Sequence, residues 1–290
     1  MNNRPSISGD NNSFEEAVFG NNTVLGSNCT FGKGCTIGHN CIIEDNVVLG
    51  DNVFIAENCI IRSNVRIGDN SSVGANCILG EWLMDFYRDR QVHVHELMIG
   101  SDALIRSGTI IYGNSKIGDS FQTGHNVTIR EDSDIGSHVS VGTNSDIQGT
   151  CKIGDYVRMH SNVHIAQHAQ IDSYVWIFPY VVLTNDPTPP SERLLGVHIH
   201  SFAVIATNAT LLPGVEIAED SLVAACANVN KDVKQYQVVG GNPAKPLTDI
   251  RNLKNRFTGE DVYPWRYHFD RAMPWENIGY EEWYNSLNIN

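Results

Sequence analysis

The sequence predicts an all-β fold, a parallel β-solenoid of six-residue repeats that ends in a short α-helical tail. From Ile99 to Leu183 an apolar residue recurs at every sixth position, with Thr123 as the one exception. Two further runs keep this period in other frames, from Phe19 to Leu79 and from Ile199 to Val229. A period of six fits neither a helix nor an isolated strand, and it indicates a solenoid in which each hexad supplies one short strand and one turn.

A second column of residues lies two positions before each large apolar residue and holds mainly small side chains or valine. Three hexads would form one triangular turn, with the large residue pointing to the axis and the small residue filling the corner. One turn cannot bury its apolar face alone, so stacked neighbours must complete the core. We expect roughly ten turns, about 50 Å in length at the usual spacing of parallel strands.

The frame shifts divide the chain into a polar N-terminal segment at 1–18, a repeat domain at 19–247 and a capping tail at 248–290. Insertions interrupt the repeats near 80–98 and 184–198. The second insertion contains Pro187, Pro189 and Pro190, which cannot join a strand ladder, so a projecting loop is expected. Such loops commonly carry function, and we favour function over a plain excursion for the second insertion, whereas the two are equally expected for the first. Within the tail, 247–257 and 280–287 show helical spacing.

Composition excludes several classes of protein. The formal net charge of -13 argues against nucleic acid as a partner, because a basic face is the usual footprint there. The first residues lack the basic and apolar regions of a signal peptide, and no run of eighteen apolar residues predicts a membrane span. A cytoplasmic location is therefore the default expectation.

The seven cysteines are best explained by packing. All but Cys226 stand in the small-residue column, and Cys41, Cys59 and Cys77 are spaced by 18, so they should stack in one file. Free cysteine behaves as a small buried hydrophobic residue. The chain has no CxxC pair of the zinc-site type, and we expect reduced thiols.

The C-terminal repeats carry more specific motifs. These are Asn208-Ala209-Thr210-Leu211-Leu212-Pro213-Gly214-Val215, then Lys231-Asp232-Val233, then Gly241-Asn242-Pro243-Ala244-Lys245. With these motifs, about residues 19 to 247 resemble the hexapeptide-repeat acyltransferases. The resemblance implies a left-handed parallel β-helix and a homotrimer. It also implies acetyl-CoA or another acyl-CoA lying between two subunits near the last turns. The left hand runs against the usual right-handed crossover preference.

The same resemblance suggests which residues hold the cofactor. We expect acetyl-CoA against the following residues: Ala206, Ala224, Ala225, Lys231, Lys245 and Arg251. CoA is anionic while the protein is acidic, so local basic residues must neutralise it, although ordinary solvated charge is an equal alternative. Ala224-Ala225-Cys226 stands where the family usually has Gly-Ala-Gly, and the added side chains would narrow the cofactor groove.

A shorter motif indicates the acceptor. Thr184-Asn185-Asp186, followed by a proline-containing loop, is similar to the branch of this family that N-acetylates nucleotide-linked deoxysugars. The resemblance implies that Asn185 and Asp186 contact a nucleotide-sugar acceptor.

Acyl transfer from a thioester requires a base near the attacking group, and histidine is the natural base at neutral pH. His125 directly follows the break at Thr123, and Gly124 would allow close approach of substrate. Asn126, Asn144 and Asn162 are spaced by 18 and would line a polar groove beside it. The alternative is a surface histidine next to an ordinary asparagine ladder. We favour His125 as the catalytic base and the three asparagines as acceptor ligands.

A second group of histidines also occupies outward positions. His168 is a rival base, because Asp186 follows it by 18 residues and would stack above it, raising its basicity. His160 and His164 are expected to contact the acceptor or a neighbouring subunit. The nearby outward aromatics, Trp176, Phe178 and Tyr180, suit a subunit interface or a stacked nucleotide base, and the interface is favoured.

The most favoured function is transfer of an acetyl group from acetyl-CoA to an amino group of a nucleotide-activated sugar, with no metal. A sugar O-acetyltransferase is the nearest alternative. A trimeric carbonic-anhydrase-like enzyme would bind zinc through three histidines. His125, His160 and His164 are separated along this sequence roughly as the three zinc ligands of such an enzyme are. The separation from His125 to His160, however, is one residue short of two turns. A non-catalytic scaffold is the third alternative.

Overall fold

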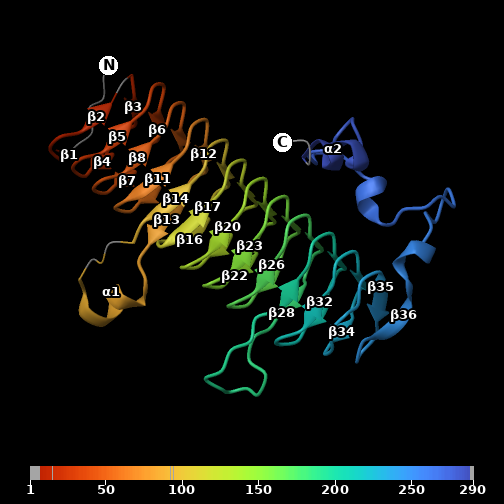
Figure 1. Ribbon diagram of the computed structural model, residues 1–290. Helices are drawn as coiled ribbons and strands as arrows, with labels where there is room; N and C mark the ends of the chain where they lie inside the picture. Colours follow the sequence, from red (N-terminus) through yellow and green to blue (C-terminus); the bar gives the residue numbers. More distant parts are fainter. Residues whose placement is uncertain (1–6, 15, 92, 94, 288–290) are drawn as a thin grey trace.

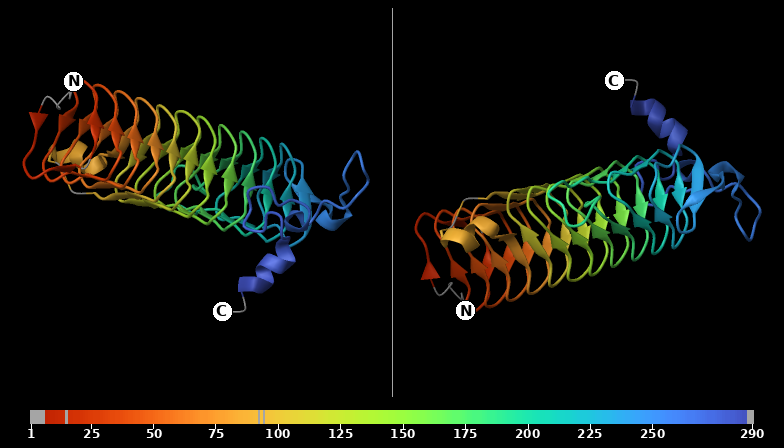
Figure 2. Two further views of the ribbon diagram at one scale, coloured as in Figure 1. Left: turned by 90° about the horizontal axis from the view of Figure 1, so that it is seen from above. Right: turned by 90° about the horizontal axis from the view of Figure 1, so that it is seen from below.

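The predicted parallel β-solenoid is confirmed. The computed structural model describes residues 7–14, 16–91, 93 and 95–287, and it forms a single column of about 12 turns (Figure 1). Three parallel sheets run along the column, and each turn usually adds a two-residue strand to each sheet. The turns stack without lateral offset, as both views in Figure 2 show.

We name the three sheets A, B and C. Sheet A contains β1 (Ile7–Ser8), β4 (Val24–Leu25), β7 (Ile42–Ile43), β10 (Ile60–Ile61), β13 (Ile78–Glu81), β16 (Ile110–Tyr112), β19 (Thr128–Ile129), β22 (Asp146–Ile147), β25 (His164–Ile165), β28 (Val182–Leu183), β31 (Thr210–Leu211) and β34 (Asn228–Val229). Sheet B contains β2 (Ser13–Phe14), β5 (Thr30–Phe31), β8 (Val48–Leu49), β11 (Val65–Ile67), β14 (Leu97–Ile99), β17 (Ser115–Ile117), β20 (Asp134–Ile135), β23 (Lys152–Ile153), β26 (Gln170–Ile171), β29 (His198–Ile199) and β32 (Glu216–Ile217).

Sheet C contains β3 (Val18–Phe19), β6 (Thr36–Ile37), β9 (Phe54–Ile55), β12 (Ser72–Val73), β15 (Leu104–Ile105), β18 (Gln122–Thr123), β21 (Ser140–Val141), β24 (Arg158–Met159), β27 (Trp176–Ile177), β30 (Val204–Ile205), β33 (Leu222–Val223), β35 (Gln237–Gly240) and β36 (Lys245–Asp249). Only the last pair, β35 with β36, is antiparallel among the described strands. The first strands lie inside the segment at 1–18, so the column is longer than the roughly ten turns expected.

The eighteen-residue register explains why the sequence folds this way. Ile111, Ile129, Ile147 and Ile165 pair in succession along sheet A, and all four are fully buried. Large aliphatic side chains therefore form continuous files along the axis. Burial of each such side chain stabilises the fold by about 1.5–3 kcal/mol, so the apolar files supply the main driving force.

The corners of the triangle are held by residues with left-handed backbone. Asparagine occupies many of these corners with φ between 55° and 62°, a conformation that it tolerates better than most residues. Its side-chain amides also form ladders between turns, as from Asn28 to Asn46 and from Asn46 to Asn64. Asparagine columns are thus a general structural feature of this solenoid.

The prediction that the cysteines of the small-residue column pack in the core is confirmed. Six of the seven cysteines are fully buried, Cys226 is exposed, and all seven are free thiols. The thiols of Cys41, Cys59 and Cys77 interact in one file. Each thiol in this file also contacts a backbone carbonyl of the next turn.

Both insertions leave the column at the same corner. The first connects β13 of sheet A to β14 of sheet B and contains helix α1 (Met84–Asp89). The second connects β28 of sheet A to β29 of sheet B and has no helix or strand of its own. Figure 1 shows the two excursions projecting on the same side of the column, five turns apart in sheet A.

The tail forms a hairpin and then packs back on the column. The predicted helix at 247–257 is wrong, because Lys245–Asp249 pairs with the edge strand β35 and only the short helix η1 (Ile250–Asn252) follows. The second predicted helix is confirmed as α2 (Tyr280–Leu287), which projects to one side of the column in Figure 2. Between them, η2 (Trp265–Tyr267) begins an aromatic layer whose buried members are Phe202, Val204, Trp265, Met273 and Trp275. No helix in the described part of the chain is long and apolar enough to cross a membrane.

Candidate functional site

The corner between sheets C and A carries His125. The residue follows β18 directly and its side chain is exposed, so it can meet a ligand or a second copy of the chain. Its backbone is fixed by the next turn: the amide donates to Thr143 Oγ1 at 3.2 Å, and the carbonyl accepts from the Asn144 amide at 2.9 Å. The structure therefore positions an accessible imidazole on a rigid corner.

The irregularity at Thr123 has a packing explanation as well as a polar one. Thr123 is buried, and its Oγ1 accepts a hydrogen bond from the Arg106 amide at 2.9 Å. Phe121 stands two residues earlier in the small-residue column and is fully buried. The two positions thus exchange large and small side chains, which conserves apolar volume in this turn. The break in the apolar period at Thr123 is therefore not in itself evidence that His125 is catalytic.

A groove of about 410 Å³ lies beside this corner on sheet C. Gly124 and Gly142 line it between Arg106 and His160, and the four residues stand in one column at intervals of eighteen. A Cβ on either glycine would meet the backbone of the next turn, so glycine is required here for close stacking of the turns. The groove reaches the tail, which contributes Arg271.

His160 lines the groove at the C-terminal end of this column. Its ring stacks on Phe178 with centroids 4.8 Å apart. Desolvation lowers the pKa of His160, and the neighbouring Arg158 lowers it further, so the imidazole is neutral at physiological pH. A neutral ring at this place can accept or donate one hydrogen bond to a ligand in the groove.

The three predicted acceptor ligands lie in one file at the same corner. Asn126, Asn144 and Asn162 all have left-handed backbone, and Asn126 donates to Asn144 Oδ1 at 3.4 Å. Their backbone conformation already explains why asparagine stands there. A role in binding remains a prediction for these amides.

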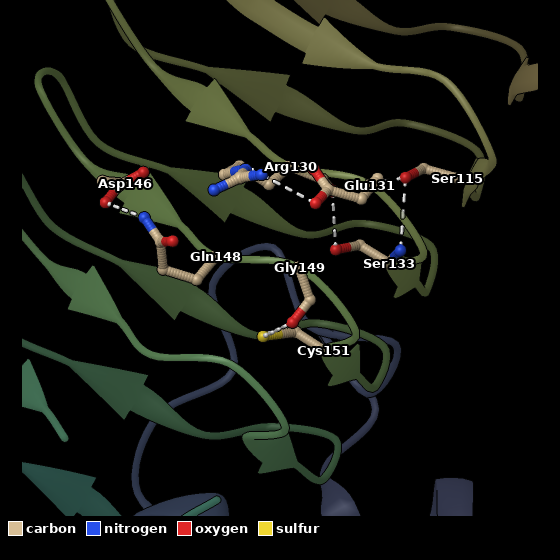
Figure 3. A network of polar contacts seen from close by, with 8 residues as sticks. All are labelled: Ser115, Arg130, Glu131, Ser133, Asp146, Gln148, Gly149 and Cys151. Atoms are coloured by element: carbon tan, nitrogen blue, oxygen red, sulfur yellow. Dashed lines mark hydrogen bonds and ion pairs between the residues drawn. The ribbon is translucent and has the colours of Figure 1, made fainter. Parts of the chain in front are cut away.

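His164 lies on sheet A, close to the same corner. Its Nδ1 is 3.1 Å from Asp146 Oδ2, and Gln148 donates to the same carboxylate at 2.6 Å. Burial acts to raise the pKa of Asp146, but these two contacts outweigh it and the pKa falls. Figure 3 shows Asp146 with Gln148, near the ion pair of Arg130 with Glu131. His164 is therefore held in place by a charged, hydrogen-bonded surface.

The proposed pair of His168 with Asp186 is not formed. A Cβ on Gly196 would lie 1.8 Å from the His168 carbonyl oxygen, so Gly196 occupies the corner position above His168. The expected stacking of Asp186 there is wrong, because the inserted loop carries Asp186 away and returns only at Gly196. Asp186 instead accepts from Thr188 and Ser191, and Ser191 holds the pKa of this carboxylate below its usual range. Asn185 accepts the Leu195 amide through its carbonyl.

The expected cofactor residues are only partly brought together. Ala206, Ala224 and Ala225 continue the corner of His125 toward the C-terminus, and Gly240, beyond Ala224 at this corner, pairs with Lys245. Lys231 lies after β34, at the different corner between sheets A and B. Arg251 forms an ion pair with Asp249 at 2.6 Å, so its guanidinium already has an anionic partner.

Among the residues that the structure describes, one cluster could hold a metal ion, and the sequence pattern did not predict it. Asp172, His198 and His200 place their ligand atoms within 4.8 Å of one another. His198 Nε2 lies 3.1 Å and His200 Nδ1 3.2 Å from the Asp172 carboxylate. The two histidines are two residues apart at one strand, a spacing that puts both on the same face. His125, His160 and His164 form no such group among the residues that the structure describes.

The comparisons with known proteins agree with this architecture. The family model of the GMPPB C-terminal domain matches residues 7–84, within the first turns. The match covers about a quarter of the chain. The six-residue period and the three parallel sheets show that the chain is a β-solenoid built from six-residue repeats.

Named relatives of this chain are acetyltransferases. It is 30% identical over 96 residues to a chloramphenicol acetyltransferase of Escherichia coli, covering 31% of this chain and 43% of the relative. It is 34% identical over 85 residues to a probable macrolide acetyltransferase of Lysinibacillus sphaericus, covering 29% and 41%. The chain thus spans less than half the length of these curated relatives.

Solved structures that match parts of this chain include PerB from Caulobacter crescentus, determined with CoA and GDP-perosamine. The TM-score is 0.36 at 20% identity, over 50% of this chain and 57% of PerB. A UDP-N-acetylglucosamine acyltransferase from Campylobacter jejuni has the same TM-score at 12% identity, over 87% of this chain and 78% of that one. Structural similarity at these low TM-scores and identities says nothing about the substrate of this chain.

Proposed function

We propose that this protein transfers an acetyl group from acetyl-CoA to an amino group of a nucleotide-activated sugar. The proposal rests on one observation: His125, the groove beside it and the three alanines expected to contact the cofactor all lie along the corner between sheets C and A. The named acetyltransferase relatives support the reaction class. The motif at 184–186 supports the acceptor class.

In the proposed reaction the acceptor amine attacks the thioester carbonyl, and His125 takes up the proton that the amine loses. Collapse of the tetrahedral intermediate breaks the C–S bond, and the proton returns to the CoA thiolate. His125 and Ala225 lie five turns apart along the corner, about 24 Å at the spacing of parallel strands. A cofactor held at the last turns must therefore extend along this edge. We expect three copies to assemble with a second subunit beside His125, which sedimentation would test.

An acceptor panel tests the function. Purified protein is assayed with acetyl-CoA for thiol release against UDP- and dTDP-aminosugars, the matching hydroxyl sugars and chloramphenicol. We expect turnover with an aminosugar nucleotide. Release with the hydroxyl sugars alone would favour O-acetylation, and saturable acetyl-CoA binding without any turnover would contradict the acceptor class. Failure to bind acetyl-CoA at all would favour the scaffold.

Replacing Asn144 by glycine should raise KM for the acceptor by roughly three- to tenfold, the value of about one hydrogen bond. Glycine accepts the left-handed backbone of this corner, so the free energy of unfolding should hardly change. Steady-state kinetics and urea unfolding measure the two effects. Asn46→Gly is the control, because Asn46 has the same left-handed backbone at the corner between sheets A and B, far from the groove. An unchanged KM would leave Asn144 a purely structural residue.

Removing metal should leave thiol release unchanged, because the proposed chemistry needs only a base and a thioester. The protein is treated with EDTA, dialysed, and assayed with and without added zinc, with metal content measured in parallel. Asp172, His198 and His200 are the residues that would bind zinc in such an experiment. Loss of turnover that zinc restores would contradict the metal-free mechanism.

A further inference from the structure

Three arginines converge on the groove beside His125. Arg106 follows β15, Arg158 lies in β24, and Arg271 comes from the tail, yet all three line the same groove of about 410 Å³. No aspartate or glutamate lines it. In a protein with a net charge of -13, this is a local concentration of positive charge.

These three arginines lack the carboxylate partners that some other arginines of the chain have. Arg62, Arg130 and Arg266 each form an ion pair with a glutamate or aspartate. Within the described residues, no ion pair joins Arg106, Arg158 or Arg271 to a carboxylate. Desolvation lowers the pKa of Arg158, and Arg271 lowers it further. Like charges held together in this way favour the binding of an anion.

The cluster also has more donors than acceptors. Arg158 Nη2 donates to the Ala272 carbonyl at 3.2 Å, but Arg158 Nε and Trp176 Nε1 are buried without a partner in the described chain. The Arg158 guanidinium lies 5.3 Å above the Trp176 ring. The described chain therefore offers this cluster fewer acceptors than it has donors, which is unusual for buried polar groups.

An aromatic pocket adjoins the groove and shares Trp176 with it. The pocket has a volume of about 240 Å³ and is lined by apolar and aromatic side chains, among them Phe178, Trp265 and Phe269. Trp176 packs edge to face on Phe269 with centroids 5.4 Å apart, so its position is set by the tail. Aromatic faces of this kind stack on nucleobases, each worth about 1–3 kcal/mol.

We propose that the groove and the pocket together bind a nucleoside diphosphate, with the phosphates at Arg106, Arg158 and Arg271 and the base among the aromatics. Guanidinium groups suit phosphate because they donate two parallel hydrogen bonds. Nucleotide-activated sugars and CoA both contain a nucleotide with a diphosphate. Because Gly124 adjoins His125, an activated sugar bound here would have its sugar next to the proposed base. The assignment of the diphosphate to an activated sugar, and not to CoA, rests on the proposed function.

Calorimetry with UDP, GDP and dTDP on the full-length protein tests the site. We expect at least one nucleotide to bind saturably, and Arg158→Gln and Arg271→Gln each to weaken it by about ten- to hundredfold, since hydrogen bonds to charged groups are the strong ones. Arg271 is exposed, so Arg271→Gln should leave the core intact. This variant therefore still tests the site if Arg158→Gln fails to fold. Arg88→Gln, at an exposed arginine of α1, is the control and should bind as the wild type does.

Competition distinguishes the two sources of the diphosphate. Simultaneous binding of CoA and nucleotide supports the site and assigns it to the acceptor, whereas displacement by CoA supports the site and assigns it to the cofactor. The inference is overturned if no nucleotide binds at millimolar concentration, or if the two glutamine variants bind as tightly as the wild type. Acetyl-CoA binding and thiol release are measured on the same samples, so the proposed function can survive this failure or fail separately.

Discussion

Replacing His125 by asparagine should lower kcat for thiol release by about 10²–10⁴, the usual contribution of a general base. Asparagine retains a polar side chain of similar length but cannot take up the proton. Because the His125 side chain is exposed and its backbone is held by the next turn, the variant should fold and bind acetyl-CoA normally. Turnover and calorimetric binding of acetyl-CoA are the two measurements.

Two matched variants make this result specific. His138 and His168 are exposed histidines at other corners, and both have the left-handed backbone that asparagine tolerates. His138→Asn should keep wild-type turnover. If His168→Asn lowers kcat while His125→Asn does not, the rival base is correct, even without Asp186 beside it. Only a modest loss at His125 would show that positioning of a neutral amine contributes more than proton transfer.

The repeat period predicted the sheets because the register is fixed by spacing alone. Residues eighteen apart must stack, and one polar residue in the file does not disturb this. The first turn escaped prediction because it has seventeen residues, as the pairings Ser8 with Leu25 and Phe14 with Phe31 show. The step from Phe14 to Phe19 is therefore five residues and breaks the period.

The tail could not be predicted in the same way, because its conformation depends on tertiary partners. Helical spacing at 247–257 is overridden by pairing with the edge strand β35, whose backbone groups would otherwise lack a partner on that side. The return of the tail to sheet C, which brings Arg271 to the groove, has no local signal either. A sequence signal did exist for one column of the groove, because its members are spaced by eighteen residues: Arg106, Gly124, Gly142 and His160.

Replacing Arg266 by methionine should destabilise the docked tail by about 3–5 kcal/mol at pH 8, because it leaves a buried carboxylate without its partner. Arg266 Nη2 lies 2.6 Å from Asp220 Oδ2, and the two side chains are 10% and 0% exposed. A second nitrogen contacts Glu219 at 2.8 Å, and the guanidinium lies 4.3 Å above the Phe202 ring. Urea unfolding followed by tryptophan fluorescence reports this, since Trp265 and Trp275 lie in the layer that Arg266 anchors.

The same variant should be less destabilised at pH 5 than at pH 8. Burial raises the pKa of Asp220 to about 6, while Arg266 opposes the rise. For an acid whose pKa is higher in the folded state than in the unfolded state, about 3.9, the contribution to stability is largest at low pH and declines as the pH passes through the folded pKa. Without Arg266 the opposing effect is lost, so the carboxyl is neutralised more readily as the pH falls.

Arg266→Met combined with Asp220→Asn should regain part of the lost stability at pH 8, because no buried charge remains. Arg256→Met, at an exposed tail arginine, is the control. A loss of less than about 1 kcal/mol at both pH values would mean that the pair behaves as a surface salt bridge. Since Trp265, Phe269 and Arg271 belong to the same tail, Arg266→Met should also weaken nucleotide binding. Arg271→Gln, in contrast, should weaken binding with no loss of stability, which separates the ligand contact from the anchor that presents it.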